Sequence, residues 1–93
     1  MRVSRRAERR ARESLQASGY LVLRARAPSL ADFVAIKRTG AGPAVSFVRV
    51  TKRVPRPREV ATLLREARMV GASVWIATVL HGAPIQWRRA GGA

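Results

Sequence analysis

The feature that most constrains the fold is a stripe of apolar residues between two helix-boundary signals in the second half of the chain. Apolar side chains recur there at three- and four-residue spacing, at Val60, Leu63, Leu64, Ala67 and Val70. Pro55 and Pro57 precede the stripe and Gly71 follows it, which predicts a helix over residues 58–70. Because such a stripe needs a surface to cover, we expect this helix to lie on a β-sheet.

Alternating and continuous apolar runs predict the strands of that sheet. Strands are expected at residues 20–26, 32–37, 45–52, 74–80 and 85–88, with turns at 39–43 and 81–84. The run at 74–80 is almost wholly apolar, as in an interior strand, whereas 85–88 is short, as in an edge strand. The run at 32–37 is apolar enough to be buried on both sides.

A first helix is predicted over residues 5–18, capped by Ser4 and ended by Gly19. Ala7, Ala11, Leu15 and Ser18 lie on one narrow stripe of this helix. The resulting order, αβββαββ, contains no internal repeat and no linker. We therefore expect a single α/β domain over residues 1–93, with a mixed β-sheet flanked by helices, and frayed ends at 1–4 and 90–93.

The charge of the chain points to a polyanionic partner. Nineteen Lys and Arg residues stand against five Asp and Glu, which gives a formal net charge of +14. All but two of the basic residues are arginine, whose planar guanidinium pairs with phosphate through two donors. This favours nucleic acid, whereas a membrane-binding helix would need large apolar residues opposite its basic face, and residues 5–18 lack them. The candidate phosphate contacts are Arg5, Arg6, Arg9, Arg10, Arg24, Arg26, Arg49, Lys52, Arg53 and Arg56.

Several other classes of protein are disfavoured by what the sequence lacks. There is no cysteine, and hence no disulfide, thiolate metal site or cysteine nucleophile. No stretch reaches the roughly 20 apolar residues of a membrane span. The first arginines are not followed by the apolar run that a secretory leader would have. We expect a cytoplasmic protein. So small a core, with so much self-repulsion, also makes a homodimer plausible.

Three segments together resemble a known family. They are ESLQASGY at residues 13–20, SLADFVAI at 29–36 and VSFVRVTK at 45–52. In order and spacing they resemble the PD-(D/E)xK nuclease superfamily, in particular the archaeal-type Holliday junction resolvases. The resemblance implies a restriction-endonuclease-like fold, places Glu13 at the family's helix glutamate and makes Asp32 its metal-binding aspartate. Ala31 stands where the family has proline.

The third segment departs from the family pattern. The family presents a glutamate and a lysine two residues apart on this strand, and the resemblance places Arg49 and Thr51 at those positions. Phe47, Arg49 and Thr51 are expected on one face of the strand, opposite Val48 and Val50. A guanidinium at a ligand position repels Mg²⁺, which needs hard oxygen ligands. The leading hypothesis is therefore a non-catalytic protein with no cofactor that binds duplex or branched DNA as a homodimer.

Two other functions remain open at this point. The first is an active Mg²⁺-dependent junction resolvase or structure-specific endonuclease using Glu13, Asp32 and a third ligand. The second is an interaction protein within a nucleic-acid-processing assembly.

Each candidate site residue also has a simpler, structural interpretation. Asp32 pairs with a neighbouring arginine, and Glu13 with Arg9 or Arg10 one helical turn back. Lys52 replaces the family's lysine only if the strand register shifts, which would turn it to the opposite face.

The remaining candidates are a histidine and two tryptophans. His81 is expected to be a turn residue rather than a catalytic base. Trp75 is expected in the core, whereas Trp87 at the edge suits either packing or base stacking.

Overall fold

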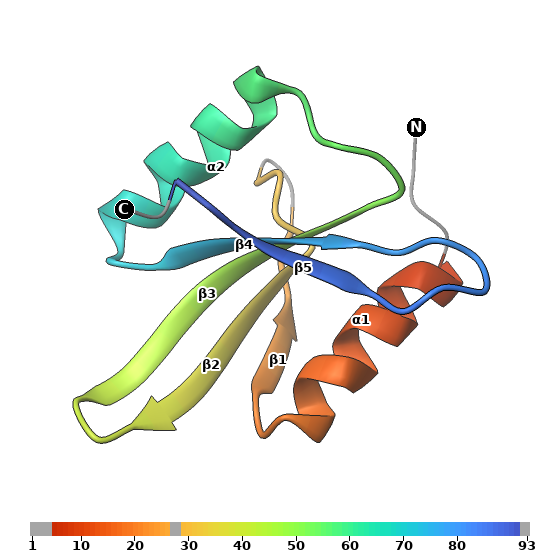
Figure 1. The fold of residues 1–93 in the computed structure, drawn as a ribbon. Helices are drawn as coiled ribbons and strands as arrows, with labels where there is room; N and C mark the ends of the chain where they lie inside the picture. Colours follow the sequence, from red (N-terminus) through yellow and green to blue (C-terminus); the bar gives the residue numbers. More distant parts are fainter. Residues whose placement is uncertain (1–4, 27–28, 92–93) are drawn as a thin grey trace.

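A five-stranded mixed β-sheet with a helix on each face forms the protein (Figure 1). The computed structural model describes residues 5–26 and 29–91. In chain order the elements are α1 (Arg5–Ala17), β1 (Leu21–Arg24), β2 (Phe33–Thr39), β3 (Gly42–Thr51), α2 (Pro57–Met69), β4 (Ser73–Thr78) and β5 (Gln86–Ala90). The predicted α/β class and the order αβββαββ are confirmed.

The strands lie in the sheet in their chain order, β1-β2-β3-β4-β5. Only β3 and β4 pair in parallel, and the other three pairs are antiparallel. Parallel neighbours need a crossover connection, and α2 provides it. As expected, β4 is an interior strand and β5 an edge strand.

Helix α1 covers one face of the sheet through small side chains. Ala7 and Ala11 are almost fully buried, and they join Leu15 in a core cluster with Val48 and Val50. Because alanine is short, the helix axis can approach the sheet closely. The predicted stripe on this helix is thus confirmed apart from Ser18, which is exposed.

Helix α2 covers the other face, where Leu63 and Ala67 are buried against Val74 and Ile76. Its apolar stripe is confirmed in the middle, but Val70 lies beyond the last helical residue and is exposed. The predicted terminator Gly71 has φ +68°, a conformation that glycine adopts without steric cost. The helix therefore ends at Met69, one residue before the predicted end at Val70.

Some predicted boundaries were wrong. The β2–β3 hairpin is tighter than expected, because Thr39 already pairs with Gly42 and β3 begins there rather than at Val45. β1 is shorter than the predicted segment 20–26. Ala90 belongs to β5, so fraying from residue 90 was wrong. The Ser4 cap and the expected fraying of 1–4 and 92–93 lie outside the described residues.

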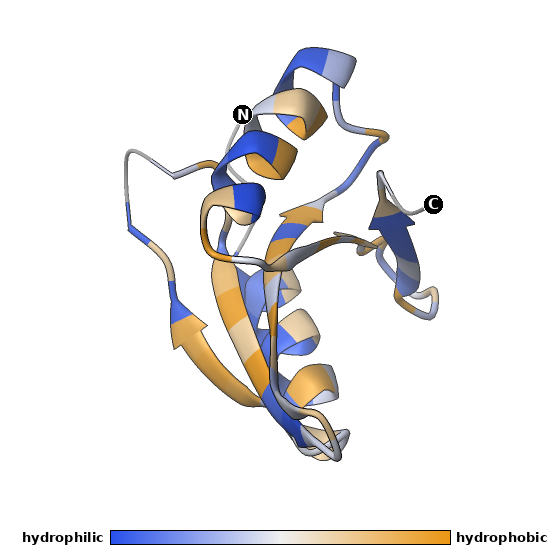
Figure 2. Cartoon of the chain, turned by 90° about the vertical axis from the view of Figure 1, so that its left-hand side faces the viewer, coloured by the Kyte–Doolittle hydropathy of each residue, from blue (hydrophilic) through white to orange (hydrophobic). Residues whose placement is uncertain are grey.

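The face opposite α1 is left partly open over β1, β2 and β3. Leu21, Ile36 and Val45 form one cross-strand row, and the register places Leu23, Val34 and Phe47 in the next. Leu21 is 59% exposed and Leu23 49% exposed, because α2 lies over β3 and β4 instead. Figure 2 shows β1 mainly in orange at the left of the view. Phe47 packs under α2, and we call the other five residues the open apolar face.

Candidate nucleic-acid interface

Asp32 is held at the junction of three strands. Its backbone N–H donates to Val48 O at 2.8 Å, and its carbonyl accepts from Ala25 N at 3.0 Å. Its side-chain Oδ2 accepts a hydrogen bond from the backbone N–H of Val50 at 2.7 Å. These bonds fix the carboxylate at the end of the sheet where β2 begins.

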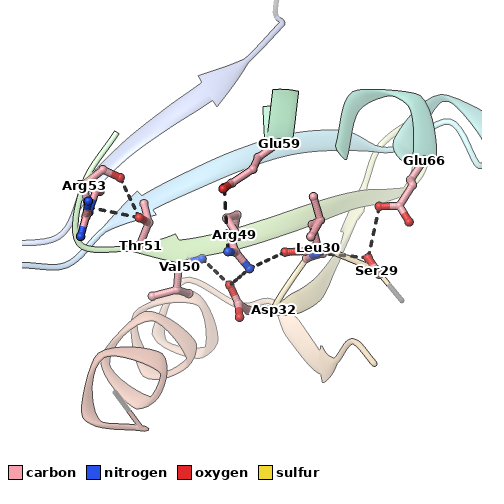
Figure 3. Close-up of polar contacts among 10 residues, drawn as sticks. Ser29, Leu30, Asp32, Arg49, Val50, Thr51, Arg53, Glu59 and Glu66 are labelled. Carbon is pink, nitrogen blue, oxygen red and sulfur yellow. Dashed lines mark hydrogen bonds and ion pairs between the residues drawn. The ribbon is translucent and has the colours of Figure 1, made fainter. Parts of the chain in front are cut away.

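Arg49 crosses this end of the sheet and contacts two carboxylates (Figure 3). Its Nη1 donates to Leu30 O at 2.9 Å and lies 3.8 Å from Asp32 Oδ2. Its Nη2 lies 4.0 Å from Glu59 Oε2, in the first turn of α2. We call Asp32, Arg49 and Glu59 the central charge cluster. Among the described residues, the buried Nε of Arg49 has no hydrogen-bond partner.

Burial raises the pKa of Asp32 above its ordinary value of 3.8. The Val50 N–H and the Arg49 guanidinium act in the opposite direction, because both favour the ionised carboxylate. The charge of Glu8 adds to the increase, and that of Arg24 opposes it. The net direction shows that the neighbouring cations do not fully offset the loss of solvent around Asp32.

Glu8, not Glu13, is the helix carboxylate that the structure brings close to Asp32. Glu8 pairs with Arg24 at 3.7 Å, and its side chain is only 21% exposed. Glu13 is exposed, and in residues 5–26 and 29–91 it forms no ion pair, so its expected pairing with Arg9 or Arg10 is absent.

The helical period could have distinguished the two glutamates. At about 100° per residue, Glu8 lies roughly 60° from the middle of the stripe Ala7, Ala11 and Leu15, whereas Glu13 points roughly the opposite way. A carboxylate beside a buried stripe faces the sheet.

The other residues predicted for the third strand lie as follows. Phe47 packs against the cluster under α2, while Val48 and Val50 face α1, so the predicted alternation is confirmed. Thr51 Oγ1 donates to Arg53 O at 2.7 Å and accepts from Arg53 N at 3.2 Å, which fixes the turn after β3. Lys52 lies within that turn and is exposed.

Most of the predicted phosphate-binding residues are exposed. They are Arg5, Arg6, Arg9, Arg24, Arg26, Lys52, Arg53 and Arg56. Arg10 differs, because it donates to Leu80 O at 3.1 Å and Ala83 O at 2.6 Å and so ties α1 to the β4–β5 loop. Arg49 is engaged in the central charge cluster.

Two basic hollows lie beside α1. One is lined by Arg5, Arg9, Arg12 and Arg24 around Glu8. The other is lined by Arg6, Arg10, Lys52 and His81. His81 is exposed in a turn, as predicted. Arg12, which lines the first hollow, was not among the predicted phosphate contacts.

The two tryptophans lie on the α1 face of the sheet. Trp75 and Trp87 are both half-buried and pack against the α1 core cluster. Trp75 was expected in the core, and it is instead only partly covered.

Neither of the two helices in the described part of the chain has the length and apolar character that a membrane crossing requires.

Comparison with known proteins identifies the architecture. The sequence matches no family model and no curated protein. Among solved structures, the chain is similar to Hjc, a Holliday junction resolvase from the archaeal hyperthermophile Archaeoglobus fulgidus. The similarity has a TM-score of 0.71 and 27% identity, and it covers 90% of this chain and 70% of that one. The chain thus resembles the archaeal Holliday junction resolvases of the PD-(D/E)xK nuclease superfamily and has their restriction-endonuclease-like fold.

Proposed function

We propose that this protein binds DNA through a nuclease-like fold without cleaving it. One observation carries the proposal: at the end of the sheet where a nuclease of this family holds its metal, Asp32 faces the guanidinium of Arg49 at 3.8 Å. The ten residues of β3, GPAVSFVRVT, contain no carboxylate, so no shift of register supplies one. A hydrolytic Mg²⁺ needs several oxygen ligands to bind and to offset phosphate charge.

The donor set at this position does not fit a divalent ion. Asp32 Oδ2 already accepts the Val50 N–H, and Arg49 supplies a positive charge next to it. Among the described residues, no group of three or more His, Asp or Glu side chains is arranged to hold a metal ion. The proposed function therefore includes no metal-assisted step.

We assign phosphate binding to the exposed cations around α1 and after β3, rather than to Arg49. The hollow formed by Arg5, Arg9 and Arg24 and the one formed by Arg6 and Lys52 present positive charge on both sides of the helix. Arg10 and Arg49 bond to groups of the protein itself. The resolvase named above suggests DNA, duplex or branched, as the ligand, and hence a cytoplasmic site of action.

We also propose that the protein acts as a homodimer. The open apolar face leaves Leu21 and Leu23 about half exposed beside Val34 and Ile36, and monomeric proteins rarely expose large contiguous apolar patches. Changing Leu21 and Leu23 to Ser is expected to convert a dimer to a monomer in sedimentation equilibrium. A wild-type protein that is monomeric at micromolar concentration would remove this part of the proposal.

A gel-shift and cleavage panel tests the main proposal. Labelled duplex, single-stranded and four-way-junction DNA are incubated with the protein, with and without Mg²⁺ or Mn²⁺, between about 50 and 200 mM salt. About six phosphate contacts predict that affinity falls on the order of a thousandfold across this range, with the DNA left intact. An affinity that does not change with salt would contradict DNA binding through phosphates.

An active endonuclease is the second candidate, favoured by the approach of Glu8 to Asp32. Both family carboxylates would then be present, with a third ligand needed from elsewhere. Metal-dependent cleavage that is lost in Asp32→Ala and in Glu8→Gln would establish this candidate. Cleavage that persists in both variants would indicate a contaminating nuclease.

A further inference from the structure

An aromatic cavity lies on the α1 face of the sheet, away from the central charge cluster. It has a volume of about 250 Å³ and is lined by residues of α1, of the turn between α1 and β1, and of β2, β3, β4 and β5, none of which belongs to that cluster. A cavity of about 150 Å³ is large enough to bind benzene. The cavity thus has room for a planar ring.

Three of the five aromatic residues of the chain line this cavity: Tyr20, Trp75 and Trp87. Trp75 pairs with Arg89, and Trp87 pairs with Ala77, so the two indoles are diagonal neighbours on one face of β4 and β5. Both side chains are only half-buried. A flat ligand can therefore contact their rings without displacing the core.

A serine hydroxyl lines the same cavity. Ser46 is 8% exposed as a residue. Within residues 5–26 and 29–91 its hydroxyl makes no hydrogen bond, yet it is not one of the fully buried polar atoms without a partner, so its oxygen is accessible to a ligand in the cavity. Ser14 of α1 and Ser18, just after this helix, add two more hydroxyls to the lining. A ligand for this site therefore carries polar atoms as well as a ring.

Two cations lie next to the aromatic lining. Lys37 Nζ is 5.2 Å from the centroid of the Tyr20 ring. Arg89, opposite Trp75 in the sheet, donates to Ser73 Oγ at 3.3 Å and remains exposed. An aromatic cavity with a hydroxyl inside and cations beside it matches a nucleotide, which has a flat polar base and an anionic backbone.

We propose that this cavity binds one unpaired nucleobase, which stacks on Trp87 of the edge strand and hydrogen-bonds to Ser46, with its flanking phosphates at Lys37 and Arg89. This inference rests on the proposed DNA binding and deepens it, because it gives the protein a preference for DNA with an unpaired base. An unpaired base is already free of its stack, so little energy is needed to place it in the cavity.

The experiment compares two DNA ligands that differ only in the base. One is a duplex with a single unpaired thymidine, and the other carries an abasic residue at that position. Affinity is measured by anisotropy of a dye on the DNA, and the occupation of the cavity by intrinsic fluorescence, since both tryptophans of the chain line the cavity. The base should strengthen binding at least about fivefold and quench the tryptophan emission.

Variants at Trp87 localise the effect. Trp87→Phe keeps an aromatic ring and should retain the preference for the unpaired base, whereas Trp87→Leu should remove it while leaving the salt dependence unchanged. Circular dichroism checks that each variant is folded. The comparison of the two DNA ligands on the wild-type protein does not depend on any variant.

The outcomes separate the inference from the proposed function. Equal affinity and equal quenching for the two ligands, with strong salt dependence, would overturn the cavity assignment and leave DNA binding intact. A preference that survives in Trp87→Leu would place the base elsewhere. Failure to bind either ligand at low salt would overturn the proposed function itself.

Discussion

Arginine side chains have different roles in two regions of this protein. In the central charge cluster, Arg49 is 26% exposed and lies within 4.0 Å of both Asp32 and Glu59. On the outer side of α1, Arg5, Arg6 and Arg9 are exposed to solvent. The comparison shows that a count of basic residues overstates the binding surface, because some cations are used to offset carboxylates that the fold brings beside them.

The largest expected effect comes from removing charge on the outer region. Changing Arg5, Arg6 and Arg9 to Ala should weaken binding to duplex DNA by about one to two orders of magnitude at 0.1 M salt. The slope of log affinity against log salt should become shallower by about three, because each lost phosphate contact removes roughly one released counterion. Fluorescence anisotropy across a salt series measures both quantities.

A matched control removes the same charge from the opposite layer. Arg58, Arg65 and Arg68 are exposed on α2, and their joint change to Ala alters the net charge equally. This control should change the salt slope much less. If the two triple variants behave identically, net charge rather than a surface around α1 governs binding, and the distinction between the regions fails for DNA.

The second effect concerns the stability of the central charge cluster. Arg49→Met should lower the free energy of unfolding by about 1–3 kcal/mol, since it leaves two partly buried carboxylates without their cation. Urea denaturation measures it. Arg24→Met is the control, because Arg24 forms a comparable pair with Glu8 at 3.7 Å but is 67% exposed, where such pairs contribute about 0–1 kcal/mol. Equal losses in the two variants would contradict a special role for Arg49.

The sequence predicted the elements better than it predicted this cluster. The stripe of α2 and the apolar run of β4 follow from local periodicity, and Gly71 terminates α2 as indicated. The contact between Arg49 and Glu59 depends on how the α2 crossover returns over the sheet, which no local pattern encodes. The position of Asp32 was predictable because it opens a buried strand. Predicting that Glu8 lies near it would have required knowing how α1 is oriented on the sheet.

The third effect tests Arg10, which the charge pattern placed among the phosphate contacts and the fold ties to the β4–β5 loop. Arg10→Ala removes hydrogen bonds to Leu80 O and Ala83 O. We expect a loss of about 1–2 kcal/mol in unfolding free energy and faster amide exchange in the loop. Arg9→Ala, an exposed neighbour, should stay within about 0.5 kcal/mol of wild type. If Arg10→Ala instead changes the salt slope of DNA binding without destabilising the protein, Arg10 belongs to the outer region.

The smallest effect is a pH dependence of the folding stability. It tests whether Arg49 fully offsets the burial of Asp32. Burial raises the pKa of Asp32, so the folded protein holds this proton more tightly than the unfolded chain does. The corresponding stabilisation is complete below the ordinary aspartate pKa of about 4 and is lost as the pH rises through the raised, folded-state pKa. Asp32→Asn keeps an oxygen acceptor for the Val50 N–H but has no charge to bury.

The stability of Asp32→Asn relative to wild type should therefore increase with pH across this acidic window and then level off. Urea midpoints of both proteins between about pH 3 and 7 measure the difference. The opposite trend would mean that the Val50 N–H and Arg49 outweigh burial, making the cluster an ordinary stabilising ion pair. The expected trend means that the fold keeps the Asp32 carboxylate at a cost in stability, as proteins do at sites retained for function. It also distinguishes the central charge cluster from the outer arginines by a measurement that needs no DNA.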